Sequence, residues 1–194
     1  MTKTVKIAIF ASGGGSNALE IIHHFSKVPS GEVSLVVSNN KNAGVLQHAL
    51  NHKIDTYIHT KQEAENGRLL EVLRGKKIDF IVLAGYLKKI SSDLIKAYPN
   101  RIVNIHPALL PKFGGKGMYG MHVHNAVVQA GESVSGPTIH YVNENYDEGD
   151  IIEQFKCKID ASDTAEDVQK KVLALEHKHF AGVIEREINK LYGI

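Results

Sequence analysis

The sequence predicts a doubly wound α/β fold, in which a mostly parallel sheet carries helices on both faces and ends in an antiparallel C-terminal extension. Up to residue 100, apolar strand-like runs alternate with helix-like segments about every 20–25 residues, as in successive β-α units. Right-handed crossovers place the helices of such units on both faces of the sheet. Beyond residue 100, strands joined by a polar turn precede one long amphipathic segment, which predicts the extension and a final helix.

The first half of the chain contains four strand–helix units. Short apolar runs predict buried strands at 5–11, 32–38, 55–59 and 78–85. Helical spacing of apolar residues predicts helices at 17–25, 43–52, 62–75 and 91–98. Ser16 or Asn17 is expected near the N-cap of the first helix, and Gly75 at the C-cap of the third. Pro99 ends the fourth helix because proline cannot continue it.

The second half predicts a different order of elements. A strand at 101–106 leads into a glycine-rich loop at 111–120 and a short helix at 122–129. Alternating patterns then predict two strands, at 136–142 and 150–159. The last predicted helix covers 164–192, with Thr164 as its N-cap and the acidic residues Glu166 and Asp167 in its first turn.

Composition limits the classes of function. The 194 residues predict one domain, 1–194, with halves at 1–100 and 101–194. The net charge of +2, with lysine and arginine scattered along the chain, argues against nucleic acid as a partner. No apolar stretch approaches the about 20 residues that span a bilayer, so we expect no membrane association. The single cysteine, Cys157, cannot form a disulfide within the chain, which favours a cytoplasmic location.

The glycine-rich stretch SGGGSN, residues 12–17, lies between the first strand and the first helix. It lacks the Gly-Lys-Ser/Thr ending of a Walker A loop. Gly13, Gly15 and Ala18 meet the spacing of a dinucleotide fingerprint, but that fingerprint also needs an acidic residue after the second strand. Residues 38–40 are Ser-Asn-Asn, without a carboxylate, so we disfavour a dinucleotide.

A single phosphate fits the same loop better. Free backbone N–H groups and the helix dipole both favour an anion at a helix N-terminus. We therefore predict a phosphate held by backbone amides and by the side chains of Ser16 and Asn17. The competing interpretation is a tight turn that binds nothing.

A second signal is NIHPALLP, residues 104–111, at the C-terminal end of a predicted strand, where ligands of open α/β sheets bind. Asn104 and His106 are two residues apart and share one face of that strand. An amide can donate to a developing oxyanion, and a histidine can carry a proton. Asp147 lies in a polar turn, and its part in the chemistry depends on reaching His106 in space. For each of these residues a purely structural role remains open.

In order along the chain, SGGGSN, AGYLKKIS (84–91), NIHPALLPKF and DEGDII resemble the glycinamide ribonucleotide branch of the folate-dependent formyltransferase family. The resemblance runs from about residue 5 to residue 190. It implies the formyltransferase fold and an enzyme of purine (IMP) biosynthesis. The reaction would transfer a formyl group from 10-formyltetrahydrofolate to the amine of glycinamide ribonucleotide, without a metal.

The resemblance also implies roles for individual residues. The catalytic residues would be Asn104, His106 and Asp147, with Asn104 and protonated His106 stabilising the oxyanion. The ribonucleotide would contact Gly15, Ser16, Asn17 and Glu176. The folate would contact Asn104, Asp147 and two segments, Leu87, Lys88, Lys89, Ile90 and Asn143, Glu144, Asn145, Tyr146. We expect a monomer or a weak homodimer.

Three alternatives stay open. Within the family, a methionyl-tRNA formyltransferase or a formyltetrahydrofolate deformylase would need an additional domain. A zinc hydrolase built on His106, His122 and His124 is a different class, but this spacing departs from common helical zinc motifs. A phosphosugar-binding module without catalysis would explain the glycine loop and leave Asn104, His106 and Asp147 without a role.

Overall fold

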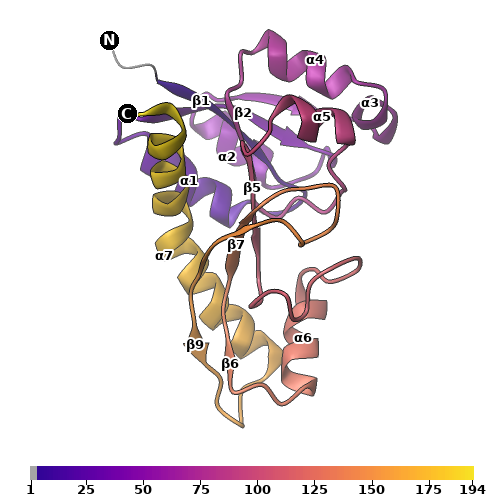
Figure 1. Ribbon diagram of the computed structural model, residues 1–194, viewed down its shortest axis with the longest axis vertical. Helices are drawn as coiled ribbons and strands as arrows, with labels where there is room; N and C mark the ends of the chain where they lie inside the picture. The colour runs from indigo at the N-terminus through magenta and orange to yellow at the C-terminus, as the bar shows by residue number, and fades with distance from the viewer. Residues whose placement is uncertain (1–3) are drawn as a thin grey trace. The chain divides into compact units, whose positions relative to one another are not determined.

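The computed structural model describes residues 4–194, which group into two compact units. Unit 1 consists of the chain up to Val103 together with Ala181–Ile194, and unit 2 consists of Asn104–Phe180. The chain enters unit 2 within one strand, β5 (Ile102–His106), and leaves it within one helix, α7 (Ala165–Tyr192). Figure 1 traces this path by colour from indigo to yellow.

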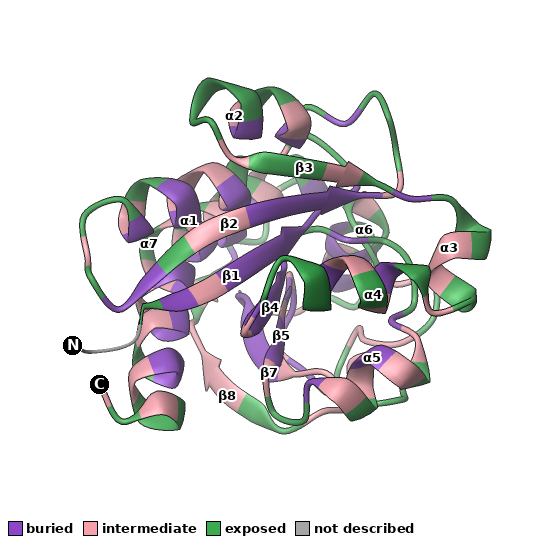
Figure 2. Cartoon of the chain, turned by 90° about the horizontal axis from the view of Figure 1, so that it is seen from above, coloured by how far each residue is buried: buried purple, intermediate pink, exposed green. Residues whose placement is uncertain are grey.

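Unit 1 has the alternating order of strands and helices that the sequence predicts. Its other elements are β1 (Val5–Phe10), α1 (Ser16–Phe25), β2 (Gly31–Ser38), α2 (Val45–Asn51), β3 (Asp55–Ile58), α3 (Lys61–Glu65), α4 (Arg68–Gly75), β4 (Phe80–Leu83) and α5 (Ser92–Ala97). Strand β1 pairs in parallel with β2 and β4, and β2 pairs in parallel with β3. Helices α1 and α4 lie on opposite sides of these strands, which is why β4 is buried throughout and β1 along most of its length (Figure 2).

One predicted helix of unit 1 is in fact two. The sequence predicts a continuous helix at 62–75, but α3 ends at Glu65 and α4 begins at Arg68. Gly67 between them has φ of 83°, a left-handed conformation that interrupts the helical hydrogen bonds. Helix α3 has its own capping box, in which Thr60 and Glu63 bond each other's backbone N–H groups. Gly75 lies inside α4, and the C-cap is Lys76.

Unit 2 contains antiparallel strand pairs and two helical segments. Its elements, besides the end of β5 and the first part of α7, are α6 (Met121–Gln129), β6 (Val134–Ser135), β7 (Thr138–Tyr141), β8 (Ile151–Gln154) and β9 (Cys157–Lys158). Strand β7 pairs with β8, and β6 pairs with β9 in a separate two-stranded sheet. A small apolar core joins α6, the end of β9 and α7 through Val127, Ile159, Val168 and Val172.

The predicted strand at 150–159 is divided between the two sheets. Its first part is β8 and its last part is β9, with Phe155 and Lys156 between them. Phe155 still donates its backbone N–H to Pro137, at 3.1 Å. The chain passes so close to Gly136 here that a Cβ at that glycine would lie 1.7 Å from the Phe155 carbonyl oxygen. The division therefore depends on a contact between segments that are distant in sequence.

The strand order in the large sheet is β3-β2-β1-β4-β5-β7-β8. Seven strands with helical crossovers and an antiparallel last pair confirm the predicted doubly wound sheet with its antiparallel extension. Within residues 4–194, no helix is both long enough and apolar enough to cross a membrane.

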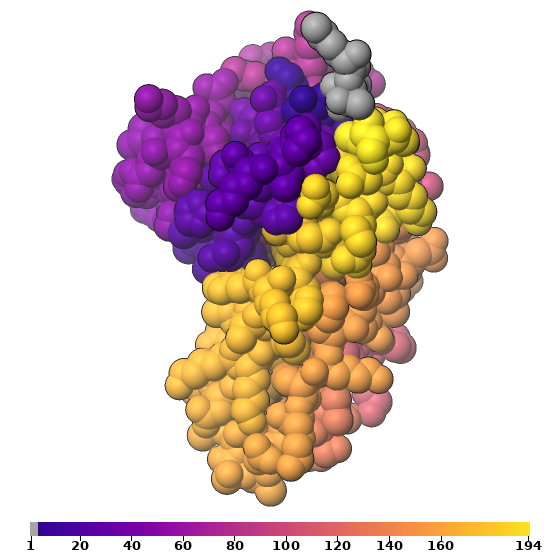
Figure 3. All heavy atoms as spheres, turned by 90° about the vertical axis from the view of Figure 1, so that its left-hand side faces the viewer, coloured from indigo at the N-terminus to yellow at the C-terminus, as the bar shows by residue number. Residues whose placement is uncertain are grey.

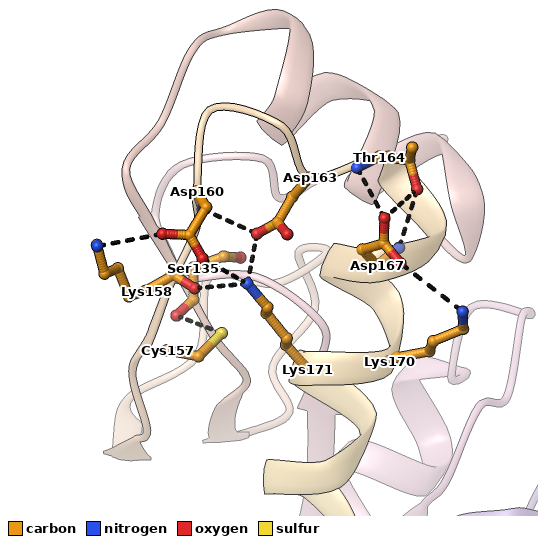
Figure 4. Close-up of polar contacts among 9 residues, drawn as sticks. All are labelled: Ser135, Cys157, Lys158, Asp160, Asp163, Thr164, Asp167, Lys170 and Lys171. Carbon is orange, nitrogen blue, oxygen red and sulfur yellow. Dashed lines mark hydrogen bonds and ion pairs between the residues drawn. The ribbon is translucent and has the colours of Figure 1, made fainter.

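Helix α7 begins at the cap that the sequence predicts. The backbone N–H of Thr164 donates to the Asp167 carboxylate at 3.1 Å, and the Asp167 N–H donates to the Thr164 hydroxyl at 3.2 Å (Figure 4). At the other end of α7, Glu185 in unit 1 bonds His24 of α1 at 2.7 Å and accepts a hydrogen bond from Ser30. Figure 3 shows this yellow C-terminal end against the indigo and purple residues of unit 1.

Candidate active site

The glycine loop turns the chain from β1 into α1. Gly15 is the N-cap, in a left-handed conformation with φ of 81°, and no side chain caps the helix. Ser16 is the first residue of the helix and Asn17 the second, so both lie near the N-cap as expected, and the N-cap itself is Gly15. The first N–H groups of a helix have no partner within it. At α1 no side chain caps these amides.

The three glycines have different surroundings. A Cβ built on Gly13 or Gly14 would meet no atom within 4 Å, so the backbone is open to a ligand at both positions. A Cβ on Gly15 would lie 2.6 Å from the Cβ of Val45, at the start of α2. Gly15 is therefore glycine because of its positive φ and its close approach to α2, whereas Gly13 and Gly14 leave the loop uncovered.

The predicted folate segment Leu87–Ile90 follows β4, also in unit 1. Lys88, Lys89 and Ile90 line a pocket of about 660 Å³, and Leu87 is half exposed beside them. The rest of the lining comes from the chain after β2 and β3 and from the start of α5, through Asn39, His59, Thr60, Lys61, Ala64, Glu65, Ser91 and Ser92. The pocket thus lies at the C-terminal ends of parallel strands, where open α/β sheets bind ligands.

The sequence did not indicate Lys61 or His59 as pocket residues. Lys61 adds a third cation to Lys88 and Lys89, and it is also paired with Glu65 at 3.7 Å. His59 accepts a hydrogen bond from the buried hydroxyl of Tyr86 at 2.9 Å and donates from Nδ1 to the Thr60 carbonyl. Burial raises the pKa of Tyr86. His59 ends the predicted strand at 55–59 and Lys61 lies two residues beyond it, and this position at the end of a strand was the available signal.

Asn104, His106 and Asp147 come together in unit 2. Asn104 and His106 lie at the end of β5, and Asp147 lies in the turn between β7 and β8. The Asp147 Oδ2 atom is 3.5 Å from Nδ1 of His106, and both side chains are largely buried. The condition that the sequence left open for Asp147, its reach to His106, is met in this geometry.

The His106 ring has a fixed orientation. Its Nε2 lies 2.8 Å from the Phe113 carbonyl oxygen, which can only accept, so Nε2 carries a hydrogen. In the neutral ring Nδ1 is then the basic nitrogen, and it faces Asp147. Burial lowers the pKa of His106 below its ordinary value, although Asp147 and the Phe113 carbonyl raise it in part. The expected effect of Asp147 on His106 is therefore present, but burial outweighs it.

His140 of β7 completes the group, and the sequence left open whether it faces the site or the core. Its Nδ1 donates to the Tyr141 carbonyl at 2.8 Å, so its Nε2 can accept from the Asn104 amide at 3.0 Å. An amide nitrogen has two hydrogens, and one remains for another acceptor. His140 Nε2 is also 3.6 Å from Asp147. The alternation of β7, which is antiparallel to β8, was the signal that could have placed His140 here.

The turn and the glycine-rich loop hold the Asp147 carboxylate. Asp147 has a left-handed φ of 57°, and its Oδ2 accepts the Gly115 N–H at 2.9 Å. A Cβ on Gly114 would lie 2.5 Å from the end of the Leu110 side chain and 3.3 Å from the Asp147 Cβ, so a larger residue would displace Leu110 and crowd Asp147. Burial alone would raise the pKa of Asp147, but His140, His106 and the Gly115 N–H together hold it below the ordinary value.

The other residues predicted to contact a substrate lie in an exposed turn of unit 2 and on helix α7. Asn143, Glu144, Asn145 and Tyr146 form the exposed turn before Asp147, and Asn145 bonds Asn143 and Glu148 within it. Glu176 is buried on the part of α7 that belongs to unit 2.

Two of the three histidines of the zinc alternative, His106 and His124, are close enough to affect each other electrostatically. His122 and His124 are on α6, in agreement with the helix predicted at 122–129. Burial, with a further contribution from nearby His106, lowers the pKa of the buried His124. Among residues 4–194, no three side chains of the types His, Cys, Asp and Glu are placed to hold a metal ion.

The sequence profile of the formyl transferase family matches residues 5–184. The chain belongs to the formyl transferase family. This confirms the resemblance seen in the four sequence motifs.

Two relatives are both named phosphoribosylglycinamide formyltransferase. The chain is 46% identical over 186 residues to the chloroplastic phosphoribosylglycinamide formyltransferase of Arabidopsis thaliana, covering 92% of this chain and 64% of the relative. It is 35% identical over 187 residues to phosphoribosylglycinamide formyltransferase of Bacillus subtilis, covering 93% of both chains. The chain thus spans less than two-thirds of the plant relative.

Solved structures in the family have the same fold. The phosphoribosylglycinamide formyltransferase of Bacillus halodurans superposes with a TM-score of 0.87 at 36% identity, covering 97% of this chain and 98% of that one. The corresponding protein of Anaplasma phagocytophilum has a TM-score of 0.88 at 30% identity, covering 96% and 88%.

Proposed function

We propose that the protein transfers a formyl group from 10-formyltetrahydrofolate to the amine of glycinamide ribonucleotide, a step in the synthesis of purine nucleotides. The observation that carries the proposal is the group formed by Asn104 and the buried His106 of β5 with Asp147 of the turn between β7 and β8. It occurs in a chain whose relatives are named phosphoribosylglycinamide formyltransferase. Neither a phosphosugar-binding module nor a tight turn gives this buried acid–base group a role.

The proposed reaction moves one formyl carbon and one proton. The neutral amine attacks the formyl carbon and forms a tetrahedral intermediate with a negatively charged oxygen. The bond from that carbon to N10 of the folate then breaks. The amine nitrogen loses one proton and N10 gains one, so the products are the formylated ribonucleotide and tetrahydrofolate. No step requires a metal.

Asn104 is proposed to stabilise the oxyanion. His140 holds one hydrogen of its amide, which fixes the orientation of the other. A donor oriented in advance towards a developing oxyanion is worth about 2.7–4 kcal/mol in acyl transfer. The hydrogen bond to His140 therefore supports Asn104 as the donor.

His106 is proposed to carry the proton from the amine towards N10. Its lowered pKa favours a neutral ring before the reaction, with Nδ1 ready to accept. Once protonated, Nδ1 faces the Asp147 carboxylate at 3.5 Å, which stabilises the imidazolium. The family resemblance implies a protonated His106 that stabilises the oxyanion, whereas here the ring is proposed to begin neutral, because burial lowers its pKa more than Asp147 raises it.

We also propose contacts for the phosphate, for the folate and for the glycinamide nucleotide. The phosphate would bind the backbone at Gly15, Ser16 and Asn17, where the helix N-terminus is uncapped by side chains. The folate would contact the segment 87–90, the turn 143–146, Asn104 and Asp147. Glu176 would contact the glycinamide nucleotide.

The proposal also covers the domain organisation, the oligomeric state, the location and the partners of the protein. We propose one formyltransferase domain across 1–194 and a monomer or weak homodimer as its state. A cytoplasmic location is supported by the single cysteine, although the plant relatives are named chloroplastic. Nucleic acid and membranes are not among the proposed partners.

A formyl-transfer assay tests the proposal. Purified protein is given 10-formyltetrahydrofolate with glycinamide ribonucleotide, aminoimidazole carboxamide ribonucleotide or charged methionyl-tRNA, and each formylated product is measured by mass spectrometry. We expect turnover with glycinamide ribonucleotide alone. His106→Ala should be far less active than the parent protein, while His52→Ala, which removes an exposed histidine of unit 1, should match the parent protein.

Two outcomes would contradict the proposal. Preference for another acceptor would move the protein to a different branch of the family. Release of formate without transfer, or activity that disappears with a chelator and returns with zinc, would mean that His106 serves hydrolysis.

A further inference from the structure

Ser12 lies between the two proposed substrate sites of unit 1. It follows β1 and directly precedes Gly13, the first glycine of the loop proposed to hold the phosphate. It is 9% exposed, so its hydroxyl is almost out of contact with solvent. A buried serine hydroxyl without partners is unfavourable, so its contacts indicate what it holds in place.

The hydroxyl of Ser12 makes two hydrogen bonds to different segments. It donates to Oδ1 of Asn39, at the end of β2, over 2.6 Å. It accepts the backbone N–H of Leu87, the first residue of the proposed folate segment, over 2.9 Å. One atom therefore connects the glycine loop with the chain after β2 and the chain after β4.

The backbone of Ser12 reinforces the same connection. Its N–H donates to the Gly85 carbonyl at 3.0 Å, and its carbonyl accepts from the Asn40 side chain at 3.4 Å. Gly85 has φ of 77°, and this left-handed conformation turns the chain from β4 towards Leu87. All polar groups of Ser12 thus bond these two neighbouring segments.

Asn39 extends the connection to the pocket. Its side chain lines the cavity that also contains Lys88, Lys89 and Ile90. Removing the Ser12 hydroxyl would leave the Asn39 oxygen and the Leu87 N–H without this partner. The start of the folate segment would then be free to shift relative to the glycine loop.

We infer that Ser12 is a positioning residue that fixes the phosphate loop and the folate segment relative to each other, with Asn39 as its partner. The inference rests on the proposed formyl transfer for the identity of the two substrates. Ser12 needs no contact with either substrate in this role.

The test compares Ser12→Ala with the parent protein. We expect KM for glycinamide ribonucleotide and KM for 10-formyltetrahydrofolate each to rise roughly tenfold, as for loss of a buried hydrogen-bond pair. We expect kcat to change less, because the acid–base group lies on other elements. Amide exchange measured by NMR should show faster exchange of the Leu87 N–H.

Two further variants separate positioning from general stability. Ser34→Ala removes a surface hydroxyl that bonds Glu32, and it should leave both KM values unchanged. Asn39→Ala should raise both KM values, and combining it with Ser12→Ala should add little, because the two side chains share one hydrogen bond.

The outcomes distinguish this inference from the proposed function. A parent protein without formyl transfer would overturn the function. An active parent protein whose Ser12→Ala variant keeps both KM values, changes only one, or loses thermal stability alone would overturn the positioning role. Unchanged exchange at Leu87 would also overturn it.

Discussion

The glycine loop of unit 1 and the acid–base group of unit 2 are built in opposite ways. The loop presents backbone N–H groups at the start of α1. Gly13 and Gly14 have no side chains that would keep a ligand from the backbone. The acid–base group is made of side chains whose orientations are fixed by hydrogen bonds, at Asn104, His106 and Asp147. Loss of a side chain should therefore affect chemistry in unit 2, and gain of one should affect binding in unit 1.

The largest expected effect is at Asn104. Asn104→Ala removes the proposed oxyanion donor, and we expect kcat to fall about 10²–10³-fold. KM should change little because the charge develops only near the transition state. Steady-state kinetics with both substrates measures this. Asn51→Ala, at the exposed end of α2, is the matched control, and a rise in KM with constant kcat for Asn104→Ala would assign it to binding alone.

A smaller effect is expected at Gly14. Gly14→Val adds a side chain where the backbone is open, so we expect KM for glycinamide ribonucleotide to rise about 10–100-fold, equivalent to about 1.4–2.8 kcal/mol of binding. Folate binding should stay near that of the parent protein. Isothermal titration with each substrate measures the two affinities. Gly75→Val, also without a neighbour within 4 Å, is the control, and equal loss of both ligands at Gly14 would indicate a folding role.

We expect a substitution at Gly15 to lower the stability of the fold more than it lowers substrate binding. Gly15→Ala places a Cβ at positive φ and against Val45, so we expect a loss of about 2–4 kcal/mol in the free energy of unfolding. Urea unfolding followed by circular dichroism measures it. Gly182→Ala, in the interior of α7 with open space around it, should instead stabilise by about 1 kcal/mol. A stable Gly15→Ala protein would contradict the packing explanation.

The sequence predicted the fold, and the shared strand face of Asn104 and His106, better than it predicted breaks between elements and partners from distant segments. Alternating apolar runs located β1 to β5, because buried parallel strands have a local signature. The break between α3 and α4 also had a local signal, the Asn66-Gly67 pair, which is typical of a turn. The division of β8 from β9 had none, because it depends on the approach of Phe155 to Gly136.

At the site too, the sequence predicted neighbours along one strand better than partners from distant segments. Asn104 and His106 are neighbours on one strand, so their spacing alone put them on one face. His140 and Lys61 belong to the neighbourhoods of these sites only through pairing of distant segments. The state of His106 could not be predicted either, because burial and Asp147 move its pKa in opposite directions and only the folded structure sets their balance.

The central claim is that His106 and Asp147 act as one proton-carrying pair. The most direct measurement is the pH dependence of kcat/KM for the parent protein, His106→Ala, Asp147→Asn and the double variant. In the parent protein kcat/KM should rise with pH through a His106 pKa below 6.5 and then level off, because the neutral ring is the base. Asp147 raises that pKa, so Asp147→Asn should move the rise to lower pH.

The double variant should be about as active as the less active single variant, since residues acting together give losses that do not add. Losses that multiply, with an unshifted pH profile in Asp147→Asn, would contradict the account.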